Sequence, residues 1–220
     1  VAVLDTGINY NHPAINGNLS RKATETADGT DSDGNELIDD VLGWDFVNGD
    51  NLPFDDQGHG SHVSGLVASS VAGIAPEAKI LPVKVLSAAG SSDFGTILQG
   101  FFYAIESDVD VINASLGVGP VPSIPPVLKR VFALAAEKNI IIVTASGNGD
   151  QKGKARDITK EIILPASLSA DHQIVVTSTA EEKHTSYGNF SSTLVHIGAP
   201  GGSQREPVFS LATANVENRA

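Results

Sequence analysis

The 220-residue sequence contains no cysteine, so it has neither a disulfide framework nor a thiol nucleophile. Basic residues are scarce: 14 Lys and Arg stand against 26 Asp and Glu, giving a formal net charge of −12. Nucleic acid is therefore excluded as an expected partner, because sequence-independent binding needs a basic surface. No apolar run approaches the roughly eighteen residues that a membrane-spanning helix requires, so no membrane-spanning segment is expected.

Apolar residues make up 41% of the chain and charged residues 18%, which is near the average of globular proteins. A chain of this length can bury a full core without metal or disulfide support. We therefore expect one folded domain over residues 1–220.

Short apolar runs rich in β-branched residues alternate with segments of helical length. The runs predict buried strands at 1–4, 80–85, 109–112, 140–143, 174–176 and 195–197. The longer segments predict helices at 61–70, 94–106 and 125–138. This alternation predicts an α/β fold with a mainly parallel sheet and helices on both faces.

Polar residues follow three of the predicted strands directly. Asp5 ends the first strand, Asn113-Ala114-Ser115-Leu116-Gly117 follows another, and Thr144-Ala145-Ser146-Gly147-Asn148-Gly149 follows a third. In open α/β sheets the ligand crevice lies beyond the carboxyl ends of the strands, so these groups are expected at one functional edge. His59 stands between two glycines, Gly58 and Gly60, which allow close approach of backbone or substrate.

Four of these segments resemble, in order, the motifs of the subtilisin-like serine peptidases. They are Asp5-Thr6-Gly7 for the aspartate motif, Gly58-His59-Gly60-Ser61-His62-Val63 for the histidine motif, Asn113 to Gly117 for the substrate strand, and Ala145-Ser146-Gly147-Asn148 for the oxyanion segment. The resemblance implies a three-layer α/β/α fold with a mainly parallel central sheet, and a single peptidase domain over 1–220 that is incomplete at both ends. It also implies a serine endopeptidase that cleaves extended polypeptides through an acyl-enzyme.

The resemblance assigns a role to each matched residue. A serine hydroxyl is a weak nucleophile, so His59 is expected as its base, Asp5 as the group that orients His59, and Asn148 as the oxyanion donor. Gly90, Ser91, Ser115, Leu116 and Gly117 match the segments that pair with an extended substrate through main-chain hydrogen bonds. No cofactor is required for this chemistry.

The family's nucleophile motif, Gly-Thr-Ser, does not occur in the sequence, although Ala199-Pro200-Gly201, which precedes it in the family, is present. One explanation is a fragment of a protease whose serine lies beyond this chain. The alternative is an inactive pseudoprotease that binds peptides. In the first case the fragment alone is inactive.

Metal sites give two further hypotheses. Asp31, Asp33 and Asn35 surround a glycine at alternate positions, as in calcium loops, so a structural calcium is a candidate ligand. Asp5, His59 and His62 offer the ligand types of a metallohydrolase. Finally, the resemblance implies a secreted or extracytoplasmic protein that is commonly made with an N-terminal propeptide.

Overall fold

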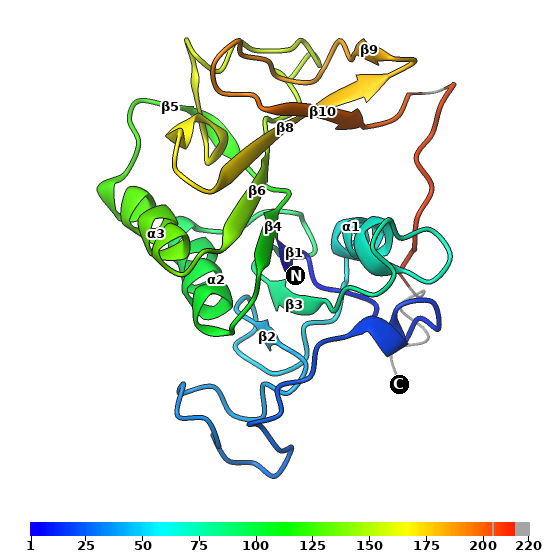
Figure 1. The fold of residues 1–220 in the computed structure, drawn as a ribbon, viewed down its shortest axis with the longest axis vertical. Helices are drawn as coiled ribbons and strands as arrows, with labels where there is room; N and C mark the ends of the chain where they lie inside the picture. The colour runs from blue at the N-terminus through cyan, green and yellow to red at the C-terminus, as the bar shows by residue number, and fades with distance from the viewer. Residues whose placement is uncertain (204, 214–220) are drawn as a thin grey trace. The chain divides into compact units, whose positions relative to one another are not determined.

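The computed structural model describes residues 1–203 and 205–213, and its contacts divide the chain into two compact units. Unit 1 contains Val1–Val109 and the described residues from Phe209 on, and unit 2 contains Asp110–Val208. Each unit has a parallel sheet with helical cover, as the alternating sequence pattern predicts (Figure 1). None of the helices in the described part of the chain has the length and apolar character needed to cross a membrane.

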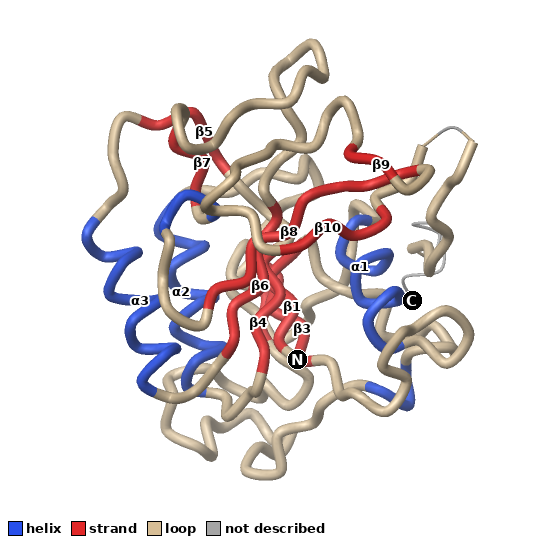
Figure 2. Tube along the Cα trace, turned by 45° about the horizontal axis from the view of Figure 1, so that its top comes forward, coloured by secondary structure: helices blue, strands red, loops and turns tan. Residues whose placement is uncertain are grey.

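In unit 1, three parallel strands lie in the order β1 (Ala2–Asp5), β3 (Leu81–Lys84) and β2 (Trp44–Asp45). Every residue of β1 and β3 is buried, which explains why both read as nearly continuous apolar runs. Helix α1 (His59–Ala68) packs on β1, and helix α2 (Phe94–Glu106) packs on β1 and β3. Figures 1 and 2 show the two helices on opposite sides of these strands.

Local sequence explains where the helices of unit 1 begin. The Asp93 carboxylate accepts a hydrogen bond from Thr96 N, so α2 begins at Phe94 as predicted. Helix α1 has a glycine, Gly58, at its N-cap. A short 3₁₀ helix, η1, spans Asn16–Asn18. The buried cluster on the α1 side consists of Val3, Ile8, Ala14, Ile15, Leu19, Ala68, Ile80 and Leu211.

In unit 2, four parallel strands lie in the order β10 (Ile197–Pro200), β8 (Gln173–Ala180), β6 (Ile141–Ala145) and β4 (Val111–Ala114). Strand β9 (Lys183–His184) pairs antiparallel with β8. Strands β5 (Val118–Val121) and β7 (Ile162–Leu164) form a separate antiparallel pair, and the 3₁₀ helix η2 (Ala166–Leu168) follows them. Helix α3 (Pro126–Glu137) packs on β6.

Two differences from the predicted elements have physical reasons. The strand predicted at 195–197 lies at Ile197–Pro200. Leu194 and Val195 pack on a buried cluster that includes Ile158 and Ile163, so the pairing of β10 with β8 begins only after them. Strands β2, β5, β7 and β9 were not predicted, because they are short or carry glycine, proline or charged residues.

Candidate active site

Two predicted catalytic residues of unit 1, Asp5 and His59, are in direct contact. Asp5 ends β1 and is fully buried, whereas His59 begins α1 and exposes 47% of its side chain. His59 Nδ1 lies 2.7 Å from Asp5 Oδ1 and 2.9 Å from Asp5 Oδ2. Because an ionised carboxylate only accepts hydrogen bonds, Nδ1 carries the donated proton, and Nε2 is the nitrogen that can take a proton from another group.

The surroundings of His59 favour its protonated form. The hydrogen bond to Asp5 raises the pKa of His59 above its ordinary value of 6.5, burial opposes this rise, and the charges of Asp5 and Asp55 add to it. A histidine whose imidazolium is stabilised by a fixed carboxylate can accept a proton and return it later. This arrangement suits general acid–base catalysis.

A second buried carboxylate, Asp55, joins the turn after Asp5 to the beginning of α1. Asp55 is fully buried. Its oxygens accept four hydrogen bonds, from Thr6 Oγ1 at 2.8 Å, Gln57 N at 3.0 Å, Gly58 N at 2.8 Å and Ser61 N at 2.8 Å. Asp55 was not predicted from the sequence, although an acidic residue just before a helix is a known signal for capping the helix N-terminus.

Helix α1 approaches the Asp5-Thr6-Gly7 turn so closely that position 60 admits only glycine. A Cβ atom at Gly60 would lie 2.1 Å from the Gly7 carbonyl oxygen. The Gly60 N–H donates to Thr6 Oγ1 at 2.9 Å. At Gly58 the backbone φ is +121°, which side chains rarely tolerate. Both glycines that flank His59 are therefore needed to bring it to Asp5.

Lys84, the last residue of β3, is a buried cation beside this turn and was not predicted as part of the site. The residue is 1% exposed. Its Nζ donates to the carbonyl oxygens of Thr6 (2.8 Å) and Leu86 (2.9 Å) and to Asp56 Oδ1 (2.8 Å). A lysine inside a buried strand is rare unless its charge is paired, and this could have signalled its role. Lys84 fixes the carbonyl group of Thr6, the residue that follows Asp5.

The metallohydrolase hypothesis finds no support in the geometry. Within the described ranges, only Glu25, Asp33 and Asp40 bring three His, Cys, Asp or Glu ligand atoms close enough to share a metal ion. Asp5, His59 and His62 form no such group there.

The predicted calcium residues lie in one loop, whose own backbone N–H groups use several of their side-chain oxygens. The Asp31 carboxylate accepts hydrogen bonds from the backbone of the loop itself, at Gly34, Asn35 and Glu36. Asn35 Oδ1 accepts from Leu37 N, and Asn35 Nδ2 donates to Asp40. Of the two predicted aspartates, Asp33 belongs to a group of three acidic residues in the described part of the chain that could hold a metal, and Asp31 does not.

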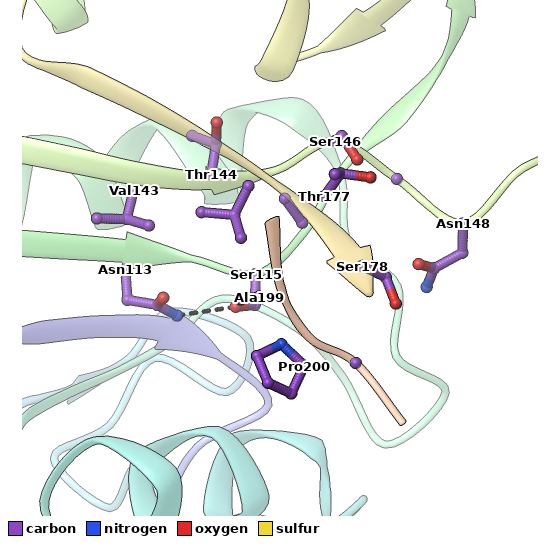
Figure 3. A pocket seen from close by; sticks show the side chains of 14 residues that line it. Asn113, Ser115, Val143, Thr144, Ser146, Asn148, Thr177, Ser178, Ala199 and Pro200 are labelled. Atoms are coloured by element: carbon purple, nitrogen blue, oxygen red, sulfur yellow. Dashed lines mark hydrogen bonds between the residues drawn. The ribbon is translucent and has the colours of Figure 1, made fainter. Parts of the chain in front are cut away.

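In unit 2, Asn148 and Ser115 line one cavity of about 320 Å³, shown in Figure 3. Residues of β4, β6, β8 and β10 form its walls. The Asn113 amide donates to Ser115 Oγ at 3.0 Å, and Ala199, Pro200 and Gly201 also line the cavity. The expectation that polar groups gather beyond strand ends is therefore met within this unit.

The predicted substrate-binding residues occupy two loops. Ser115, Leu116 and Gly117 connect β4 to β5 and are partly or fully exposed. Gly90 and Ser91 lie in an exposed turn of unit 1 before α2, in which Ser87 N donates to the Ser91 carbonyl. Both segments leave backbone groups accessible to a ligand.

Asn189 holds the segment that carries Asn148. Asn189 is 1% exposed, and its Nδ2 donates to the Ser146 carbonyl at 2.9 Å. Its Oδ1 accepts from Gly149 N at 3.0 Å and from Arg156 N at 2.8 Å. No motif or periodicity marks Asn189, which is why it was not predicted.

Comparisons with known proteins agree on one family. The sequence model of one protein family, described as the Subtilase family, matches residues 1–219. An intracellular serine protease of Paenibacillus polymyxa is 35% identical over 91% of this chain and 56% of its own length. The major intracellular serine protease of Bacillus subtilis is 33% identical, over 91% of this chain and 57% of its own length.

A solved structure gives the same result. The crystal structure of a cold adapted subtilisin-like serine proteinase matches with a TM-score of 0.69 at 27% identity, covering 91% of this chain and 62% of that one. This match confirms the predicted three-layer α/β/α fold class with a mainly parallel sheet. The chain spans about half the length of the curated relatives it matches.

The expectation of a secreted or extracytoplasmic protein is wrong. Two of the relatives are named intracellular serine proteases, which points away from secretion. The expectation rested on the family resemblance. Cysteine usage could not have corrected this expectation, because a chain without cysteine gives no information about the redox state of its compartment.

Proposed function

The chain belongs to the subtilase family, and from this premise we propose that it is the part of a serine endopeptidase that carries the aspartate and histidine of the catalytic machinery. The observation that carries the proposal is the 2.7 Å contact between His59 Nδ1 and the buried Asp5 carboxylate. This contact presents His59 Nε2 as a base, which a serine nucleophile requires.

In the proposed reaction, His59 Nε2 takes the proton of the serine hydroxyl as its oxygen attacks the substrate carbonyl. The same nitrogen later gives that proton to the leaving amine. Asp5 keeps the proton of the neutral ring on Nδ1 and stabilises the imidazolium that forms. The Asn148 side-chain amide is proposed to donate a hydrogen bond to the oxyanion of the tetrahedral intermediate. These steps use no cofactor.

The proposed substrates are polypeptides bound in extended form. Two segments, Ser115 to Gly117 and Gly90 with Ser91, are proposed to pair with the substrate backbone, as in strand addition to a sheet. Main-chain pairing of this kind gives affinity for many sequences. Selectivity would then come from side-chain pockets.

The nucleophile requires a separate assignment, because the sequence contains no Gly-Thr-Ser segment. We assign it to a serine outside these 220 residues. The same absence favours a second candidate function, a pseudoprotease that binds peptides without cleaving them.

The test measures kcat/KM of the full-length protein on an extended chromogenic peptide. His59→Ala and Asp5→Asn should each lower kcat/KM by about 10⁴-fold or more. His172 is an exposed histidine of unit 2, so His172→Ala is the matched control and should leave kcat/KM unchanged. A folded wild-type protein that binds the peptide but never cleaves it would contradict the proposal and support the pseudoprotease.

A further inference from the structure

One buried side chain of unit 2, that of Asn189, holds the backbone on both sides of Asn148. Asn189 lies between β9 and β10 and is 1% exposed. Its Nδ2 donates to the Ser146 carbonyl at 2.9 Å, and its Oδ1 accepts from Gly149 N at 3.0 Å. Asn148 stands between these two partners in the sequence. The side chain of Asn189 therefore fixes the segment two residues before Asn148 and one residue after it.

The backbone of Asn189 adds further contacts to the same segment. Asn189 N donates to the Gly147 carbonyl at 2.9 Å, and the Asn189 carbonyl accepts from Ser146 Oγ at 3.0 Å. That carbonyl also accepts from Thr177 Oγ1 of β8 at 2.6 Å. Ser146, Gly147 and Gly149 are thus each bonded to Asn189, and Thr177 bonds Asn189 to the sheet.

The local sequence does not by itself hold Asn148 in one orientation. Glycines stand on both sides of it, Gly147 with a φ of +99° and Gly149 with a φ of +80°. Glycine reaches this left-handed region at little cost, but it also populates many other conformations, so contacts from elsewhere must offset the entropy that is lost when it is fixed. A Cβ atom at position 147 would lie 2.6 Å from Asn189 Nδ2, so only a glycine allows this close contact. Asn189 supplies the contacts that fix both glycines.

The side-chain chemistry of Asn189 fits its three backbone partners. The Ser146 carbonyl needs a donor, and two backbone N–H groups need an acceptor; one amide side chain supplies both. The second of these N–H groups is Arg156 N, at 2.8 Å from Asn189 Oδ1. Aspartate has the same shape, but an ionised carboxylate only accepts, so it would place an oxygen against the Ser146 carbonyl. Asn189→Asp is therefore a nearly isosteric change that removes one of these hydrogen bonds.

We propose that Asn189 is a positioning residue of the peptidase reaction, which holds Ser146 to Gly149 so that the Asn148 amide keeps a fixed place at the cavity wall (Figure 3). This inference rests on the proposed function, in which the Asn148 amide donates to the oxyanion. A donor stabilises a transition state only if it is already in place when charge develops, and a displacement of about 1 Å can cost about 10²-fold in rate. The contribution of Asn189 is therefore expected in kcat and not in KM.

The test is a double-mutant cycle on the full-length protein, with kcat and KM measured on an extended chromogenic peptide. Asn148→Ala should lower kcat by about 10²–10³-fold. Asn189→Asp should lower kcat by about 10-fold or more and change KM by less than about 2-fold. In the Asn148→Ala background, Asn189→Asp should change kcat by less than about 2-fold, because the group that it positions is gone. Asn139 is an exposed asparagine of unit 2, so Asn139→Asp is the matched control and should leave kcat and KM unchanged.

A role in the fold alone would make Asn189→Asp lower kcat by the same factor in both backgrounds, and that result would overturn the proposal. So would a wild-type kcat in Asn189→Asp while Asn148→Ala is impaired, and in that case the proposed function stands. A wild-type kcat in Asn148→Ala, or no cleavage by the folded wild-type protein, overturns the proposed role of Asn148 and the inference with it.

A second measurement needs no catalysis and applies even if Asn189→Asp fails to fold. NMR relaxation of the wild-type protein should give the backbone amide of Asn148 an order parameter of about 0.85, the value of a rigid backbone. In Asn189→Ala, which removes the side-chain contacts without adding repulsion, this order parameter should fall below about 0.6. A value below about 0.6 in the wild-type protein, or an unchanged value in Asn189→Ala, would overturn the proposal.

Discussion

Replacing Asp55 by asparagine tests the network that holds Asp5 and His59 together. Asparagine has the shape of aspartate, but one oxygen becomes an NH₂ group, which can only donate. In one orientation this group faces Ser61 N, and in the other it faces Thr6 Oγ1 and two backbone N–H groups. Either way, at least one buried donor loses its acceptor.

The structure sets the size of this effect. Each buried N–H without an acceptor costs about 1–3 kcal/mol, and the remaining hydrogen bonds lose their charge assistance. We therefore expect Asp55→Asn to lower the free energy of unfolding by about 2–4 kcal/mol. The charge of Asp55 also helps to raise the pKa of His59, so the pKa of His59 should fall in the variant. A base works when unprotonated, so the acid limb of the activity profile should move to lower pH.

Two measurements check this prediction. Urea unfolding gives the change in stability, and an NMR titration of the His59 imidazole gives its pKa. Glu77→Gln is the matched control, because Glu77 is exposed and is not among the groups that shift the pKa of His59. The reasoning is refuted if Asp55→Asn changes stability by less than about 0.5 kcal/mol, the range of ordinary surface substitutions. An unchanged pKa of His59 would refute the charge coupling.

Three further predictions follow from the same contacts. Gly60→Ala should destabilise the protein by about 3 kcal/mol, because the new Cβ meets the Gly7 carbonyl oxygen; a thermal melt that matches wild type would contradict this. Asn189→Ala should speed amide hydrogen exchange at Gly149 by about 10-fold or more, since that N–H loses its acceptor, while the amides of α2 serve as the control. The raised pKa of His59 stabilises the fold fully below pH 6.5 and less as pH rises through the folded pKa. Urea unfolding should therefore show the stability difference between wild type and His59→Gln shrinking over that range, and a constant difference would count against the shift.

The parts of the site that the sequence predicts are those with a local signal. Asp5 stands at the end of an apolar run, and His59 stands between two glycines before a helical pattern. Both signals depend on neighbouring residues only. The contact between Asp5 and His59 then follows once parallel strands and the helix are assembled, and the structure contains it.

The supporting residues could not be found in this way. Lys84 is recognised only when its distant acceptors Thr6 and Asp56 are known, and Asn189 only when it is placed beside Ser146. The calcium prediction selected Asp31 by its spacing from Asp33, but the loop backbone uses the Asp31 carboxylate. Spacing along a chain does not show which carboxylate oxygens will accept hydrogen bonds from backbone N–H groups.

The central claim is that His59, oriented by Asp5, activates a serine. The most direct measurement is labelling of the full-length protein by a fluorophosphonate, read as the mass added to the intact protein. We predict labelling of one serine in the wild-type protein, and a labelling rate lower by about 10³-fold or more in His59→Ala. No labelling of a folded wild-type protein, or equal rates in both proteins, would contradict the claim.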